Sequence, residues 1–333
     1  MHDSEYAELR HLVKQKGLLD KQPFYYTYKI LLTLGLLSLG LTFFFLINNF
    51  WLQLLNAAYL AFVFTQIGFV GHDAGHREIC RVAWKDEIIG LFCNLLIGVS
   101  YSWWNDTHNR HHGNPNQLDL DPAIDFLAPA FTEEQARSKE GVLWFVVKYQ
   151  AYFFFPLLSM YPFNMRINSI QFLIQKKTKY PLVEALLLVV HFILYFGLVF
   201  SRLGVQQAVL FIIVHQALFG LYAGSVFASN HKGMPILDKE SRLDFLRRQV
   251  LTTRNVKTHP FIDFWYGGLN YQIEHHLFPT MARNKLGEAQ KIVKPFLQAH
   301  SITYHETSAL GSYWEILQYF HHVSAPLRQE KTR

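Results

Sequence analysis

Three short clusters carry the residues of this sequence that are best able to do chemistry. They are His72-Asp73-Ala74-Gly75-His76, His108-Asn109-Arg110-His111-His112 and Gln272-Ile273-Glu274-His275-His276. On a helix, residues three and four positions apart share a face, with Cβ atoms about 5–6 Å apart. Each cluster can therefore direct its imidazoles at a common point. Seven histidines and one glutamine favour more than one metal ion, because one such ion takes about four to six ligands.

The type of ligand narrows the chemistry. A set of imidazoles with few carboxylates suits zinc, copper or iron. Zinc needs three or four ligands and no neighbouring ion, so the number of donors favours a pair of ions. Paired iron activates dioxygen, and a cofactor of this kind is required to attack an unactivated C–H bond. Each cluster lies near the end of an apolar stretch rich in Phe and Trp, which suggests an acyl chain as substrate.

The composition is that of a membrane protein. Of the 333 residues, 50% are hydrophobic and 16% are aromatic, while only 17% are charged, against about 25% in soluble domains. The net charge of +6 comes without a basic and aromatic recognition motif, so we expect no binding of nucleic acid. Two cysteines cannot form a disulfide framework, which favours a reducing compartment. The N-terminus does not resemble a signal peptide.

Long uncharged stretches predict the membrane spans. Residues 30–71 contain no Lys, Arg, Asp or Glu, and as one helix they would run about 63 Å, twice the thickness of a bilayer core. We therefore expect spans near 30–49 and 52–71, with a turn at Asn48-Asn49. A second pair is expected near 183–201 and 205–229. The prediction is an all-α integral membrane protein, one domain over 1–333, with four transmembrane helices in two hairpins and a helical cap that holds a di-metal site.

The distribution of basic residues predicts the orientation. All of the 31 Lys and Arg except Arg202 lie in residues 1–29, 72–180 or 230–333. Because cytoplasmic loops are enriched in basic residues, we expect these three segments, both termini and the active site to be cytoplasmic. Residues 88–104 are apolar, but a crossing there would separate the first two clusters, so we interpret them as re-entrant or interfacial. Residues 142–163 suit a helix in the headgroup plane.

The clusters, their order and their spacing resemble those of the membrane fatty acid desaturases. The stretch from Gly267 to Pro279, GGLNYQIEHHLFP, is similar to the front-end branch, in which glutamine replaces the first histidine of the third motif. The resemblance covers roughly residues 30–300. It implies a four-span fold with a cytosolic cap, two iron ions, and insertion of a cis double bond between an existing double bond and the carboxyl end.

The resemblance also implies the site residues. The implied metal ligands are His72, His76, His108, His111, His112, His231, Gln272, His275 and His276. Of these, Gln272 either ligates weakly or through a water, or only shapes the site. The expected supporting residues around the ligands are Asp73, Asp106, Glu274 and Asn230, with the carboxylates accepting N–H bonds from ligand imidazoles.

Partners follow from the same resemblance. The substrate is expected on coenzyme A or on a glycerolipid, with dioxygen as the oxidant and membrane lipids around the spans. Many relatives carry a fused cytochrome b5 domain, and this sequence has no His-Pro-Gly-Gly. We therefore expect a separate electron donor, a ferredoxin or cytochrome b5 with its reductase, and favour a bacterial inner membrane over the endoplasmic reticulum. Two alternatives stay open: a di-iron lipid hydroxylase or ketolase, and a zinc-binding receptor or transporter.

Other polar residues receive simpler interpretations. His191 and His215 lie inside predicted spans, where packing with a hydrogen bond to a neighbouring helix is expected. The polar run at Asn116, Asp119, Asp121 and Asp125 lacks the spacing of an EF-hand, so we interpret it as a capped loop. Three arginines, Arg247, Arg248 and Arg254, could meet a phosphate group or reflect the orientation alone.

Overall fold

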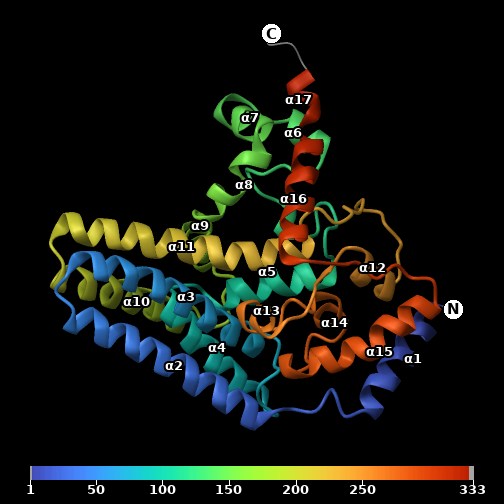
Figure 1. The fold of residues 1–333 in the computed structure, drawn as a ribbon, viewed down its shortest axis with the longest axis horizontal. Helices are drawn as coiled ribbons and strands as arrows, with labels where there is room; N and C mark the ends of the chain where they lie inside the picture. The colour runs from blue at the N-terminus through green and yellow to red at the C-terminus, as the bar shows by residue number, and fades with distance from the viewer. Residues whose placement is uncertain (1, 330–333) are drawn as a thin grey trace. The chain divides into compact units, whose positions relative to one another are not determined.

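The computed structural model describes residues 2–329, which form helices and a two-stranded parallel sheet (Figure 1). The chain divides into two compact units, each assembled from segments distant in sequence. The first unit comprises Met1–Asp20, Thr107–Leu157 and Ser225–Arg333, and the second comprises Lys21–Asp106 and Leu158–Gly224. The expectation of one domain over 1–333 stays a prediction.

The second unit contains the long apolar helices. Its helices are α2 (Pro23–Leu46), α3 (Phe50–Gly75), α4 (Ala83–Ile97), α9 (Tyr161–Ile174) and α10 (Pro181–Arg202). Helices α5 (Tyr101–Gly113), α8 (Gln150–Leu158) and α11 (Val205–His231) have residues in both units. Four of these helices, α2, α3, α10 and α11, are long and apolar enough to cross a membrane, so the four predicted spans are confirmed. Helix α2 begins seven residues before the expected start, because its aromatic and basic headgroup residues are already helical.

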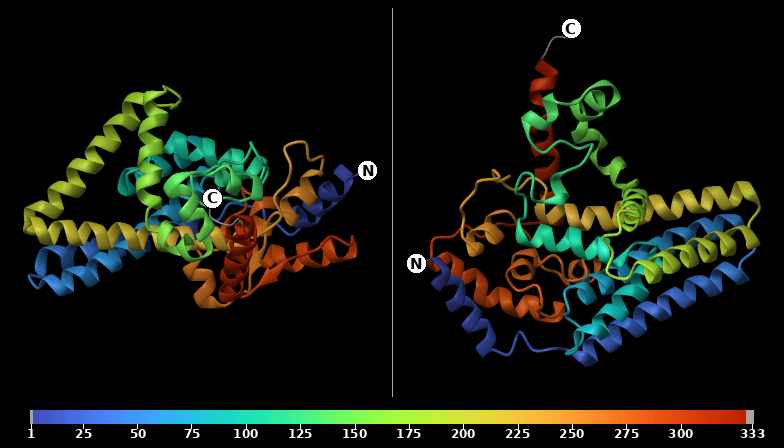
Figure 2. Two further views of the ribbon diagram at one scale, coloured as in Figure 1. Left: turned by 90° about the horizontal axis from the view of Figure 1, so that it is seen from above. Right: turned by 180° about the vertical axis from the view of Figure 1, so that it is seen from behind.

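Helices α2 and α3 run side by side as a hairpin (Figures 1 and 2). Asn49 begins α3 by accepting a hydrogen bond from the backbone N–H of Leu52. Three side chains of α3 then donate to backbone carbonyls of α2 or its end: Gln53 to Phe44 (2.9 Å) and Ile47 (2.6 Å), Asn56 to Gly40 (3.0 Å), and Tyr59 to Leu36 (2.8 Å). We call these three side chains the α3 ladder.

The second hairpin joins the first through side chains of the second unit. Helices α10 and α11 diverge from the turn between them (Figure 2). Near that turn Phe44 of α2 contacts Phe211 of α11 with ring centroids 5.4 Å apart. Arg202 donates to the carbonyl of Phe45 (2.7 Å) and to Oδ1 of Asn48 (3.1 Å). This arginine therefore links the ends of α2 and α10.

Two apolar stretches are bent rather than straight. Helices α4 and α5 meet at 108°, across a break that contains Gly98 in the left-handed region. Helices α7 (Gly141–Lys148) and α8 meet at 103°. A bent pair fits either a broken span or a re-entrant loop, so the interpretation of residues 88–104 as re-entrant or interfacial stays a prediction. The expected single helix over 142–163 is wrong, because the chain there forms the bent pair and then begins α9.

The first unit is built from short helices around a second apolar core. Its remaining elements are α1 (His2–Gln15), the 3-10 turns η1 (Pro122–Ile124) and η2 (Arg283–Lys285), α6 (Glu133–Arg137), α12 (Phe245–Leu251), α13 (Pro260–Trp265), α14 (Gln272–Leu277), α15 (Leu286–Ala299), α16 (Ala309–Val323), α17 (Ala325–Gln329), β1 (Asn255–Val256) and β2 (Glu306–Thr307). Leu9 and Val13 of α1 pack with Ile273 and Leu277 of α14 in this core. Helix α14 is consequently buried along its whole length.

Candidate metal centre

Three elements of the first unit supply the clustered histidines. The last two turns of α5 carry His108, His111 and His112, and α11 ends on His231. Helix α14 carries His275 and His276. Its six residues are held by the burial of Ile273 and by a hydrogen bond from the Ile273 N–H to Oδ1 of Asn255 (2.8 Å).

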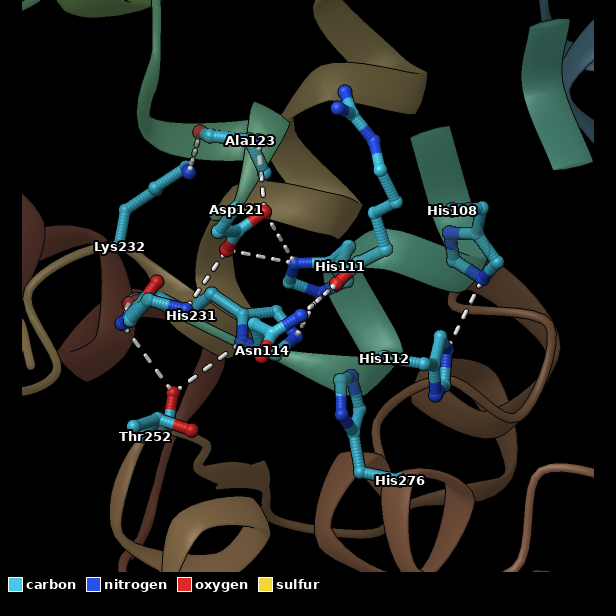
Figure 3. A network of polar contacts seen from close by, with 12 residues as sticks. His108, His111, His112, Asn114, Asp121, Ala123, His231, Lys232, Thr252 and His276 are labelled. Carbon is cyan, nitrogen blue, oxygen red and sulfur yellow. Dashed lines mark hydrogen bonds and ion pairs between the residues drawn. The ribbon is translucent and has the colours of Figure 1, made fainter. Parts of the chain in front are cut away.

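The six imidazoles form two triplets. Nitrogens of His111, His231 and His276 all lie within 4.8 Å of one another, and we call this set the inner triplet (Figure 3). Nitrogens of His108, His112 and His275 also lie within 4.8 Å of one another and form the outer triplet.

The two triplets divide each pair of adjacent histidines. Neighbouring residues on a helix point about 100° apart, whereas residues three or four apart share a face. His111 and His112 therefore enter different triplets, as do His275 and His276, whereas His108 and His112 stay together. The expectation that each cluster directs all of its imidazoles at one point is wrong for these adjacent pairs.

Each imidazole of the inner triplet has an acceptor behind it. Nδ1 of His111 lies 2.9 Å from a carboxylate oxygen of Asp121 (Figure 3). Nδ1 of His231 lies 3.3 Å from the carbonyl oxygen of Thr252, and Nδ1 of His276 lies 2.8 Å from Oε1 of Gln249. Because these oxygens only accept, each Nδ1 carries the proton and each Nε2 keeps its lone pair.

These lone pairs face one another. Nε2 of His111 lies 3.2 Å from Nε2 of His231, and Nε2 of His276 has no hydrogen-bond partner within residues 2–329. Converging lone pairs of buried imidazoles repel unless a cation lies between them. The inner triplet therefore fits a metal ion, and its three nitrogens are of the type that zinc, copper and iron accept.

The outer triplet lies against the inner one. Nε2 of His108 is 3.1 Å from Nε2 of His112. The ring of His112 stacks on that of His276 with centroids 4.1 Å apart and meets the ring of His275 at 4.8 Å. Two donor sets in contact fit a pair of metal ions.

Gln272 and Asn230 lie beside the inner triplet. Nε2 of Gln272 is 2.9 Å from Nε2 of His231, and Oε1 of Gln272 accepts a hydrogen bond from Nδ2 of Asn230 (2.9 Å). Asn230 also donates to the carbonyl of Leu269 (2.9 Å). The amide of Gln272 is thus held against a candidate ligand by a buried neighbour.

The first cluster lies in the second unit. His72 and His76 occur at the end of α3, with ring centroids 4.7 Å apart. Nδ1 of His72 is 3.3 Å from a carboxylate oxygen of Asp73, the type of contact that the sequence predicts for this aspartate. The ring of Trp104 packs against both imidazoles.

Two other predicted carboxylates have different surroundings. Asp106 is exposed on α5. Glu274 is buried and accepts hydrogen bonds from Nδ2 of Asn255 (2.7 Å) and from the hydroxyl of Tyr304 (2.9 Å), neither of which is an imidazole. Burial raises the pKa of the Glu274 carboxyl to about 7, against the lowering effect of Asn255. Its contacts hold α14 in place.

Burial favours the neutral form of the candidate ligand His276. Burial lowers the pKa of the His276 imidazole well below its ordinary value, and the neighbouring His231 and His111 lower it further. Burial raises the pKa of Asp121, but the charge and the hydrogen bond of His111 outweigh that effect and leave this pKa below its usual range. A neutral imidazole with an ionised acceptor behind it is the form that binds metal.

A buried arginine holds the end of α11. Arg254 is fully buried. Its guanidinium donates to the carbonyls of Ser229 (2.6 Å) and Lys232, on either side of His231, and to the carboxylate of Glu315 (2.7 Å). A cation at a helix C-terminus is favourable. Arg254 is therefore an internal cap, and not a residue that could meet a phosphate.

Sequence reasoning missed three supporting residues: Asp121, Gln249 and Thr252. Asp121 was visible only as part of a polar run. In the structure that run is a loop whose Asn116 donates from Nδ2 to the carbonyls of His231 (3.1 Å) and Thr252 (3.4 Å). The signal that could have found Asp121 is its spacing of ten residues after His111, across a short loop.

Comparisons with known proteins give one consistent family. The profile of the fatty acid desaturase family matches residues 49–308. The chain is 31% identical over 315 residues to the Delta(6)-fatty-acid desaturase fat-3 of Caenorhabditis elegans, covering 90% of this chain and 70% of that protein. It is 26% identical over 335 residues to the Delta(5) fatty acid desaturase fat-4 of the same animal (97% and 74%). It is 29% identical over 320 residues to a Delta(8)-fatty-acid desaturase of Euglena gracilis (90% and 74%).

Proposed function

The chain belongs to the fatty acid desaturase family, and we propose that it inserts a cis double bond between an existing double bond and the carboxyl end of an acyl chain. The prediction of the family from the three histidine clusters is confirmed, and the names of the relatives agree with the front-end branch. As a member of this family the chain is an enzyme, an oxidoreductase that acts on fatty acyl substrates.

We assign the metal as a pair of iron ions. His111, His231 and His276 would hold one ion, and His108, His112 and His275 would contribute to the other. The sequence also predicts His72 and His76 as metal ligands, and Gln272 would stay beside the inner triplet. Two bound irons would supply the activation of dioxygen that attack on an unactivated C–H bond requires.

The chain's own residues keep the donors ready for the metal. Asp121, Gln249 and the carbonyl of Thr252 hold the Nδ1 protons, so each inner imidazole offers Nε2. Partners of this kind typically change metal affinity by about 10- to 100-fold when removed. Burial also lowers the pKa of the His276 imidazole, which favours its neutral form.

The remaining parts of the proposal come from the sequence. The acyl chain would be carried on coenzyme A or a glycerolipid, and a ferredoxin or cytochrome b5 would supply electrons from outside. Basic residues on one side of the predicted spans support a cytoplasmic location for both termini and the active site.

The observation that carries this function is the pair of histidine triplets at the ends of α5, α11 and α14. It is tested by expressing the chain with linoleate in a host lacking such desaturases, followed by product mass and metal analysis. We expect a product lighter by two hydrogens and bound iron, both lost in His111→Ala. A product that gains oxygen would instead indicate a hydroxylase. Fully bound zinc without oxygen consumption would indicate a non-enzymatic metal protein.

A further inference from the structure

A buried carboxylate of the second unit is attached to the first turn of α5. Glu184, in the first turn of α10, accepts hydrogen bonds from the hydroxyl of Ser100 (2.5 Å) and the backbone N–H of Ser102 (3.1 Å). The hydroxyl of Ser102 donates to its other oxygen. Ser100 in turn accepts a hydrogen bond from the N–H of Trp103 (3.1 Å), so the serine caps α5 and the glutamate holds the cap.

The charge of Glu184 is compensated by this helix end. Its side chain is 1% exposed, and no Lys or Arg pairs with it among residues 2–329. A buried carboxylate without compensation is costly, whereas the N-terminus of a helix offers unpaired N–H groups and a positive partial charge. The position of α5 is consequently tied to that of a buried anion.

Helix α9 holds the other side of the same bend. Arg166 donates to the carbonyl of Ile97 (2.9 Å), the last residue of α4, and to Oε1 of Gln216 (2.8 Å). One helical turn further, the hydroxyl of Ser169 accepts a hydrogen bond from the backbone N–H of Ser100 (3.0 Å). A cation thus lies at the C-terminus of α4 and an anion at the N-terminus of α5, as their dipoles favour.

We propose that Glu184 is a positioning residue for α5, which fixes the first turn of the helix whose later turns carry His108, His111 and His112. His111 lies ten residues after the start of α5, about 15 Å along the helix. A tilt of about 4° at the first turn would displace it by about 1 Å, whereas metal–ligand distances hold within about 0.2 Å. This inference rests on the proposed metal centre.

The test compares metal binding and turnover in Glu184→Gln with the parent protein. Glutamine keeps the shape but replaces one carboxylate oxygen with an amide NH2 group, which cannot accept the hydrogen bond that this oxygen receives from a serine hydroxyl. We expect the dissociation constant for cobalt(II), read from its visible absorption in the metal-depleted protein, to rise at least tenfold. We also expect kcat to fall at least tenfold while KM for the acyl substrate stays within twofold.

A matched control is Glu87→Gln. Glu87 lies on α4 and pairs with Lys179 (2.8 Å) and the hydroxyl of Tyr180 (2.7 Å). Its variant should bind cobalt as the parent does. If Glu184→Gln does not fold, Ser102→Ala and Ser102→Thr replace it: alanine should weaken cobalt binding, and threonine, which keeps the hydroxyl, should restore it.

The outcomes separate the two proposals. A parent protein that binds no cobalt overturns the metal centre itself. A parent that binds cobalt, together with Glu184→Gln or Ser102→Ala variants that bind it equally well, overturns the role of Glu184. Lower thermal stability of these variants with unchanged cobalt affinity and kcat would make Glu184 a structural residue only, and would equally overturn the inference.

Discussion

Buried histidines occur in both units, but they are arranged differently. In the first unit, His111, His231 and His276 bring three nitrogens within 4.8 Å. In the second unit, Nδ1 of His191 lies 2.9 Å from the carbonyl of Leu95, and Nδ1 of His215 lies 2.8 Å from the hydroxyl of Tyr195. Each of these two imidazoles binds a neighbouring helix, as the sequence predicts, and they do not form a shared donor set.

The comparison teaches what separates a ligand from a packed histidine. Burial is common to both, since His215 is fully buried and His276 is 1% exposed. The difference is that the inner triplet places acceptors behind the imidazoles and leaves lone pairs converging in front. An amide nitrogen contacts an imidazole in both places, Gln216 at Nδ1 of His215 (2.9 Å) and Gln272 at Nε2 of His231 (2.9 Å). In the inner triplet, however, Nε2 of His231 also faces Nε2 of His111 (3.2 Å).

The largest effect is expected from removing a converging imidazole. His276→Ala should lower desaturation at least 1,000-fold and remove iron, because one ion loses a donor and Oε1 of Gln249 loses the N–H of His276. Product analysis and iron content measure this. Full iron and normal turnover in this variant would remove the distinction between the two sets of histidines.

A smaller effect is expected from the acceptor behind His111. Asp121→Asn replaces the carboxylate with an amide, so metal affinity should fall by about 10- to 100-fold. Asp119→Asn is the matched control, because among residues 2–329 Asp119 pairs with the exposed Lys239 (3.3 Å), and its variant should leave affinity unchanged. Metal titration of the depleted protein measures both. Equal affinities would mean that the carboxylate does not support its imidazole.

The packed histidines should affect stability alone. His215→Phe leaves the Tyr195 hydroxyl without its acceptor, while the Gln216 amide still donates to that hydroxyl (3.0 Å), so we expect a cost of about 1–3 kcal/mol in the free energy of unfolding. Thermal unfolding in detergent checks the loss, and iron content should stay at the level of the parent. A loss of iron here would show that the intramembrane pair serves the metal centre after all.

The smallest effect is expected at Gln272. Its amide contacts Nε2 of His231 but is held by Asn230, so Gln272→Ala should change iron content and turnover by no more than about tenfold. A loss as large as that of His276→Ala would make Gln272 a ligand in its own right. Metal analysis alongside turnover distinguishes these outcomes.

The sequence predicts the spans and the histidines, but not their partners. The absence of charged residues over 30–71 is enough to predict two spans, because an uncharged stretch of this length is about twice as long as one crossing of the bilayer core requires. The spacing of four residues between His108 and His112 is enough to predict that both lie on one face of a helix. The same helical geometry places His111 and His112 in different triplets. This placement can be recognised only when the other histidines of each triplet are known.

Tertiary contacts decide the rest. Gln249 supports His276 across 27 residues, and Thr252 supports His231 through a backbone carbonyl, which no side-chain pattern reveals. Glu184 is an unremarkable acid at the start of a span until its serine partners, more than 80 residues earlier, are seen. Such partners depend on where distant helices end.

The α3 ladder bears on how the chain enters the bilayer. Its donors at 53, 56 and 59 satisfy carbonyls of the preceding helix only, so this pairing needs nothing that is synthesised later. Hydrogen bonds between helices in lipid are worth about 0.6 kcal/mol each on average, and the ladder also fixes one register. Helices α2 and α3, residues 23–75, can thus insert into the bilayer as a paired hairpin. The helices that follow in the sequence can then pack against this hairpin.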